Sequence, residues 1–136
     1  MSFFKENSPT DLEILEAIYN RSYNSFISYK DNNEVRESKI YVPIDIEKIA
    51  YDLKVDEDII FGRLHYHLEN KYGYVNENDK HVYFFANRFG NDIHCVNFPY
   101  LSAVLSKLRD RNNKYFITQA IAITALIISI TSLFIT

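Results

Sequence analysis

The chain has 136 residues, which is enough for one domain of ordinary size. Three glycines and three prolines stand beside 11 tyrosines and 10 phenylalanines, and this composition argues against long disordered stretches. The single cysteine, Cys95, excludes an internal disulfide and indicates a reducing compartment. Ile and Asn are abundant and Ala is scarce, which favours an AT-rich bacterial or phage genome as the source.

Charge is unevenly distributed along the chain, although the net charge is only -3. Residues 1–106 carry 17 acidic and 11 basic side chains, a net charge of -6. Residues 107–114 carry four basic side chains against Asp110, a net charge of +3. The basic residues are Lys107, Arg109, Arg111 and Lys114. Positive charge therefore gathers where the chain meets its apolar C-terminal stretch.

The N-terminal region has the signals of a helix rather than of a signal peptide. No cationic segment followed by an apolar segment is present, so residues 1–114 are expected to stay where they are made. Ser8 is the expected N-cap, with Pro9 at the first helical position and Asp11 at the third. Apolar residues then recur at helical spacing to about residue 28, and the polar stretch 29–38 is expected to be a loop.

A strand and two more helices are expected next. Residues 40–43 form the strand, which a proline ends, and Asp45 caps the second helix. Lys54 and Val55 make a tight connection to the third helix, which Asp56 caps and which ends near residues 72–73. The inward-facing residues of this third helix are expected to be Ile59, Ile60, Leu64 and Leu68.

A β-hairpin is expected after the third helix. Residues 74–75 and 81–85 form its strands and residues 77–80 its turn. Residues 93–98 are a candidate third strand, and Pro99 opens a helix that continues into the apolar stretch. The fold class is therefore α+β, with a long C-terminal helix.

Residues 10–86 resemble the winged helix-turn-helix superfamily in the order of their elements. The pattern is clearest in residues 44–85, IDIEKIAYDLKVDEDIIFGRLHYHLENKYGYVNENDKHVYFF. The resemblance implies three helices plus a β-hairpin wing, with the third helix as recognition helix and residues 74–85 as the wing. It implies the fold and leaves the function open, since one fold hosts many functions.

Two functions remain for this domain. The superfamily implies that the third helix binds duplex DNA, but that helix opens with Asp56, Glu57 and Asp58, where phosphate contacts would fall. The preferred hypothesis is therefore an interaction module that binds a protein partner as adaptor or inhibitor. The alternative is a membrane-anchored transcriptional regulator that binds DNA. The expected binding surface consists of Arg63, Tyr66, His67, Asn70 and Lys71 on the third helix, together with Lys80 in the turn.

No enzymatic activity, cofactor or metal is expected. His65 and His67 are two residues apart, so they point to different faces of a helix and do not chelate one metal. His94 and Cys95 are adjacent in a strand and alternate in direction. The glycines at 62, 73 and 90 are too far apart for a phosphate-binding loop.

Residues 115–136 are expected to form a single transmembrane helix. These 22 residues carry no charge, and at about 1.5 Å per residue they span roughly 33 Å, which is enough for a hydrocarbon core of about 30 Å. The basic cluster on the N-terminal side places residues 1–114 in the cytoplasm by the positive-inside tendency. The expected organisation is a cytoplasmic domain (1–98), a basic juxtamembrane helix or linker (99–114) and a tail anchor (115–136) in the inner or plasma membrane.

The apolar stretch carries a stripe of small residues at alternating spacings of four and three. The stripe consists of Thr118, Ala122, Ala125, Ser129 and Ser132. Small residues let helices approach closely in lipid, so the stripe predicts a homodimer through this helix. Asn112 and Asn113 could break the helix before the stripe begins. The four basic residues of 107–114 are expected to contact lipid headgroups.

Overall fold

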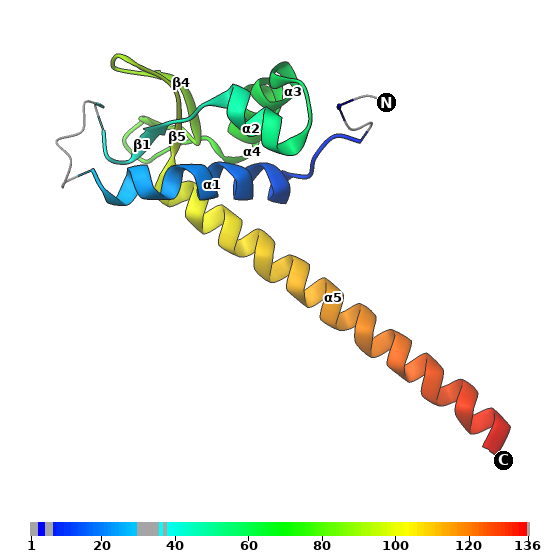
Figure 1. Cartoon of the computed structure of the whole chain (residues 1–136). Helices are drawn as coiled ribbons and strands as arrows, with labels where there is room; N and C mark the ends of the chain where they lie inside the picture. Colours follow the sequence, from blue (N-terminus) through cyan, green and yellow to red (C-terminus); the bar gives the residue numbers. More distant parts are fainter. Residues whose placement is uncertain (1–2, 5–6, 30–35, 37, 136) are drawn as a thin grey trace. The chain divides into compact units, whose positions relative to one another are not determined.

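The computed structural model describes residues 3–4, 7–29, 36 and 38–135. The chain divides into two compact units, Met1–Leu105 and Ser106–Thr136. The helices and strands follow in the order α1 (Asp11–Ile27), β1 (Tyr41–Pro43), α2 (Ile46–Leu53), α3 (Glu57–Gly62), the π-helical turn η1 (Arg63–Leu68), α4 (Glu69–Tyr72), β2 (Tyr74–Val75), β3 (His81–Val82), β4 (Phe85–Phe89), β5 (Asp92–Asn97) and α5 (Phe98–Ile135) (Figure 1). The described residues therefore form an α+β protein with a long C-terminal helix.

Helix α1 begins two residues later than predicted. Thr10, and not Ser8, is the N-cap: its hydroxyl accepts a hydrogen bond from the backbone N–H of Glu13, and the Glu13 carboxylate accepts one from the Thr10 N–H. This reciprocal capping box satisfies two N–H groups at the start of the helix that have no carbonyl acceptor within it. The helix buries Ile14, Leu15 and Ile18, which face the rest of the core.

The second and third helices are joined by the tight connection that was predicted. Asp45 caps α2 and Asp56 caps α3 through their side chains. Between them Lys54 adopts a left-handed conformation, with φ of 57°, and ends α2 by donating its N–H to the Ala50 and Tyr51 carbonyls. A left-handed residue at this place reverses the chain within a few residues.

The third predicted helix is continuous from Glu57 to Tyr72 but contains the π-helical turn η1. The wider turn keeps side chains four residues apart in line, where an α-helix would let them drift around the axis. Ile60, Leu64 and Leu68 are fully buried in one such line. Ile59, which was predicted to face inward, is 44% exposed, so that prediction is wrong.

A three-stranded antiparallel sheet has the order β1-β5-β4, and β2 and β3 form a separate two-stranded hairpin. The predicted hairpin is present, but its second strand ends at Val82 and not at Phe85, which begins β4. The Glu69 carboxylate accepts hydrogen bonds from the Phe84 and Phe85 N–H groups at 2.8 and 2.7 Å. These bonds lie just after β3, where the chain leaves the hairpin and enters β4. The strand predicted over 93–98 is present as β5, which pairs with β4 and β1.

Arg36 is the described part of the polar stretch between α1 and β1. Although it was predicted to lie in a loop, its side chain is buried and donates to the carbonyls of Ser25, Ser38 and Lys39. A buried guanidinium needs such acceptors, because its charge is costly to remove from water. Residues 30–35 and 37 of the predicted loop lie outside the described residues.

Helix α5 runs without interruption through Asn112 and Asn113, so the helix break considered at these residues does not occur. Its first turns belong to the folded unit, where Phe98, Leu101 and Leu105 are buried. Further along, α5 contains an 18-residue window with a mean hydropathy of 2.0, none of it buried. Among the described residues it is the one helix that is long and apolar enough to cross a membrane.

Candidate interaction surface on the third helix

The four-residue repeat gives the third helix four rows of side chains. The core row is Ile60, Leu64 and Leu68; the sheet row is Phe61, His65 and Glu69; the outer row is Gly62, Tyr66 and Asn70; the α1 row is Ile59, Arg63, His67 and Lys71. Each row meets a different environment. The chemistry that the helix offers a ligand therefore depends on the outer row, on the exposed His65 of the sheet row and on the part of the α1 row left accessible.

Three basic residues of the α1 row converge on Asp11 at the start of α1. The Asp11 carboxylate lies 2.5 Å from Arg63 Nη2, 3.3 Å from His67 Nε2 and 3.6 Å from Lys71 Nζ. Burial raises the pKa of this carboxyl, but its hydrogen bonds to Arg63 and His67 outweigh burial and hold the pKa below its usual value. One carboxylate thus contacts all three basic side chains of the row.

Arg63 was predicted to lie on an exposed binding face, and the structure corrects this placement. Its side chain is 22% exposed and also donates from Nη1 to the Ser8 hydroxyl and the Pro9 carbonyl, at 2.9 and 2.6 Å. The guanidinium therefore fastens the segment before α1 to the third helix. A planar group with five donors suits this task better than lysine would.

The outer row carries the exposed part of the predicted surface. Tyr66 is 70% exposed, and Asn70 lies one turn further along the row with its amide donating to the Tyr66 carbonyl at 2.9 Å. His67 and Lys71 are about half exposed, but both face Asp11. The structure therefore gathers Tyr66 and Asn70 into one uncharged patch and separates the predicted cations from it.

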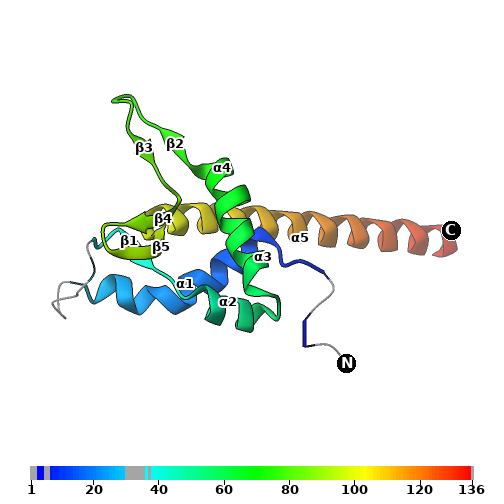
Figure 2. The ribbon, with the colours of Figure 1, turned by 90° about the horizontal axis from the view of Figure 1, so that it is seen from above.

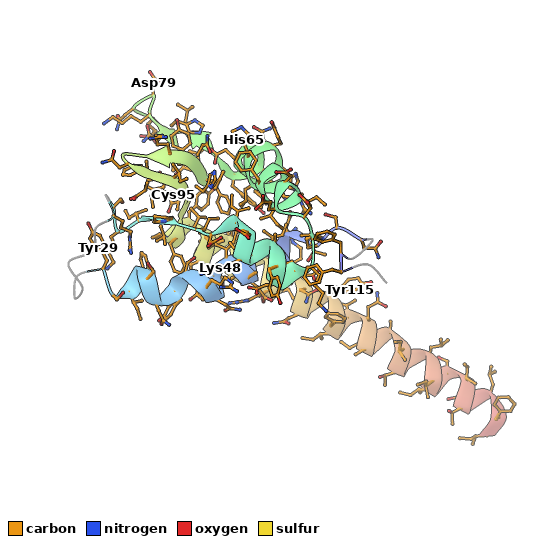
Figure 3. All side chains as sticks on the ribbon, turned by 45° about the horizontal axis from the view of Figure 1, so that its top comes forward. Tyr29, Lys48, His65, Asp79, Cys95 and Tyr115 are labelled. Carbon is orange, nitrogen blue, oxygen red and sulfur yellow. The ribbon has the colours of Figure 1, made fainter. Side chains whose placement is uncertain are left out.

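Lys80, the last predicted binding residue, lies on the β2–β3 hairpin. Figure 2 shows this hairpin extending away from the three-stranded sheet, and Figure 3 places Asp79 at its tip. The Asn76 side chain accepts from the Asn78 and Lys80 N–H groups, and Asp79 takes a left-handed conformation with φ of 57°. Lys80 is exposed there, on an element distinct from the outer row.

Glu69 is an organising residue that the sequence reasoning missed. Besides the two backbone N–H groups at the start of β4, its carboxylate meets His81 Nε2 at 3.0 Å, and its side chain is only 15% exposed. A Cβ on Gly73 would collide with Glu69, including its carbonyl oxygen at 2.7 Å, so glycine is needed there.

The histidines contact aromatic rings and carboxylates. His65 stacks on Phe61, and His94 meets the edge of the same ring, with centroids 5.4 and 5.5 Å apart. No group of three His, Cys, Asp or Glu side chains in the described part of the chain could hold a metal ion. Cys95 is buried, and burial raises the pKa of its thiol to about 11, so the thiolate is scarce at neutral pH.

In the second unit, the basic cluster and the small-residue stripe are exposed on a helix. Lys107, Arg109, Arg111 and Lys114 all face solvent, and Lys114 pairs with Asp110 at 3.1 Å. The hydroxyls of Ser129 and Ser132 donate to the carbonyls four residues earlier, at 3.0 Å each. These two hydroxyls are therefore satisfied within the helix, and pairing of the stripe depends on close packing of the backbone.

The chain was compared with known protein families, curated proteins and solved structures. No known protein family, curated protein or solved structure matches the chain.

Proposed function

We propose that this chain is a membrane-tethered interaction module whose folded unit is a winged helix and binds a protein partner. The outer row of the third helix, with Tyr66 and Asn70, is the proposed contact surface. The module acts as an adaptor or inhibitor held at the cytoplasmic face of the membrane. No cofactor takes part in this function.

The order of the elements supports the winged helix. The short strand β1 lies between the first two helices in the chain. It joins one sheet with β4 and β5, which form the second hairpin after the third helix. In this proposal the wing is the β4–β5 hairpin, with its turn near Gly90, and not residues 74–85. Gly90 has φ of 60°, a conformation that glycine adopts without strain.

The preference for a protein partner rests on the contacts of Asp11 with the basic side chains of the third helix. These are Arg63, His67 and Lys71. Binding to duplex DNA depends on basic side chains that neutralise phosphates. These three basic side chains already face a carboxylate, at distances of 2.5 to 3.6 Å. The surface left outward is aromatic and uncharged, and Tyr is enriched where protein interfaces gain most of their affinity.

The alternative, a membrane-anchored transcriptional regulator, rests on the same winged-helix order of elements. It requires the third helix to meet a duplex although Asp56, Glu57 and Asp58 stand at its start, all of them exposed. The hairpin tip adds Lys80, with Glu77 and Asp79 beside it. Negative charge at both places repels phosphates, so the protein partner is favoured.

Membrane attachment is supported by the exposed apolar part of α5. Its mean hydropathy of 2.0 over 18 residues suits a bilayer core. The four basic residues lie on the N-terminal side of this part only, which favours a cytoplasmic folded unit and a single pass. The proposed location is the inner membrane of a bacterium or a plasma membrane.

The test compares three full-length proteins purified in mild detergent: wild type, Tyr66→Ala with Asn70→Ala, and the control Asn87→Ala on β4. We expect one membrane or cytosolic protein to co-purify with wild type and with the control and to be lost with the outer-row variant. Mass spectrometry identifies it. If the outer-row variant retains the same protein, the outer row is not the contact surface.

The DNA alternative is tested on the same samples by nuclease treatment and by gel shift with genomic DNA fragments at about 50 mM salt, where phosphate contacts are strong. The proposal expects no shift with the wild type. A shift that disappears in Lys71→Ala and Lys80→Ala but persists in Tyr66→Ala would establish the DNA-binding function instead.

A further inference from the structure

A surface pocket lies between the segment before α1 and the α2–α3 connection, away from the outer row. Its floor is Ala50 and Val55, both at least 96% buried. Its walls are the rings of Phe3, Phe4 and Tyr51, with the Phe3 and Tyr51 ring centroids 5.5 Å apart. The pocket is thus lined by apolar and aromatic groups that stay partly exposed to solvent.

The charge that the described residues place on the rim of this pocket is negative. Among the described residues that line the pocket, the charged ones are Glu47, Asp56 and Glu57, and none is Lys, Arg or His. The Asp56 carboxylate accepts a hydrogen bond from the Asp58 N–H as a helix cap, whereas Glu47 and Glu57 form no ion pair in the described part of the chain. The pocket therefore offers two carboxylates and an aromatic wall to a cationic segment with an apolar side chain.

Such a segment exists in the second unit of the same chain. Residues 107–116, KLRDRNNKYF, carry a net charge of +3 and end in two aromatic residues. Tyr115 and Phe116 are 60% and 62% exposed. The basic side chains of the segment are complementary in charge to the carboxylate rim of the pocket, and its two aromatic residues suit the aromatic wall.

We propose that the acidic–aromatic pocket binds the basic segment 107–116 of a second copy of this chain. Exposed ion pairs are individually weak, about 0.2–1 kcal/mol each, so one contact would not hold two free chains together. Two features strengthen it: each copy offers one pocket and one segment, so a two-fold pair makes the contact twice, and anchoring in one membrane raises the effective concentration. The contact leaves the outer row of the third helix free.

Mixed disulfides test this contact in membranes. One tagged chain carries Tyr51→Cys and a differently tagged chain carries Asn112→Cys, two exposed, uncharged positions that leave every charge in place. The buried Cys95 gives little background. Under mild oxidation we expect a heterodimer band that carries both tags. Its absence, while both chains fractionate with membranes, overturns the inference and leaves the proposed partner site standing.

A charge swap makes the test specific. Glu47→Lys with Glu57→Lys in the pocket chain should lower the yield of the mixed disulfide about tenfold, which corresponds to about 1.4 kcal/mol. Lys107→Glu with Arg111→Glu in the other chain should restore it. The control Asp79→Lys makes the same change of sign at the hairpin tip and should leave the yield unchanged.

Two outcomes of the swap would contradict the proposal. If the yield of the mixed disulfide does not change when the pocket charges are reversed, the two cysteines meet through random collisions. A disulfide that forms only within one chain, in the double variant Tyr51→Cys with Asn112→Cys, would assign the basic segment to the pocket of its own chain.

Discussion

The two ends of α5 differ in how their apolar residues are distributed around the helix. At its start the apolar residues Phe98, Leu101, Val104 and Leu105 are spaced by three and four residues and are all buried in the folded unit. From Tyr115 onward apolar residues occupy every side of the helix, and none is buried. A one-sided stripe is enough where protein covers one face, whereas lipid surrounds a helix completely. The comparison teaches that one continuous helix can carry two distributions of apolar residues, one suited to a protein core and one suited to a bilayer.

The largest expected effect comes from the buried end. Leu101→Ala removes a fully buried side chain and leaves a cavity, so we expect the free energy of unfolding of the folded unit to fall by about 2–5 kcal/mol. Thermal unfolding followed by tyrosine fluorescence measures it in detergent. The matched control Ile121→Ala, on the exposed part of α5, should not move the transition. Equal shifts in both variants would remove the distinction between the two ends.

A charge in the apolar end should break membrane association alone. Leu126→Lys places an ammonium near the middle of the proposed span, at a cost of about 2.5–3.5 kcal/mol for insertion. We expect part of the protein to become extractable by carbonate while thermal unfolding of the folded unit stays unchanged. Leu126→Ile is the control and should remain in the membrane fraction. A lysine variant that resists extraction would contradict the span.

A change of pH should alter the stability of the folded unit and leave membrane association unchanged. The folded-state pKa of Asp11 lies below its unfolded value of about 3.9, so its stabilisation is present above that value and is lost as pH falls through the folded pKa. Asp11→Asn should lower the free energy of unfolding at pH 7 by about 1.5–3 kcal/mol.

Denaturant titrations between pH 7 and pH 2 measure this effect. The difference between wild type and Asp11→Asn should shrink at the acid end, and membrane association should not change. A difference that is constant with pH would show that the Asp11 carboxylate has the same pKa in both states.

The smallest expected effect concerns self-association of the apolar end. Ala122→Leu with Ala125→Leu would keep two helices apart and weaken a dimer by about 1 kcal/mol, whereas the control Ile123→Leu lies off the stripe. Crosslinking yield or analytical ultracentrifugation in detergent measures it, and insertion should be intact. Unchanged dimers in the stripe variant would leave the helix as an anchor only.

Local signals in the sequence predicted the helices well and the long-range contacts poorly. The caps Asp45 and Asp56 and the turn at Lys54 were found because each depends on a few neighbouring residues. The second strand of the hairpin was predicted to be too long because Glu69, some 15 residues earlier, accepts from the Phe84 and Phe85 N–H groups. Sequence spacing carries no sign of such a bond.

The candidate surface shows the same limit. Tyr66 and Asn70 were predicted to be exposed and are. Arg63 was assigned to the same face because a helix of 3.6 residues per turn was assumed, but the π-helical turn and the carboxylate of Asp11, 52 residues away, turn it to α1. A change of helical period inside one helix has no reliable signature in a single sequence.

The π-helical turn also sets how this protein tolerates changes in length. Six residues of a π-helical turn, at about 4.4 residues per turn, rotate around the axis by nearly the same angle as five residues of an α-helix at about 3.6 per turn. Deleting one residue from Arg63–Leu68 would therefore let the helix return to the tighter period with its two halves still in phase, and the Glu69 carboxylate would still face the start of β4. A single deletion in this turn should harm the fold less than a deletion in the α-helical part before it, where each residue lost rotates the rest of the helix by about 100°.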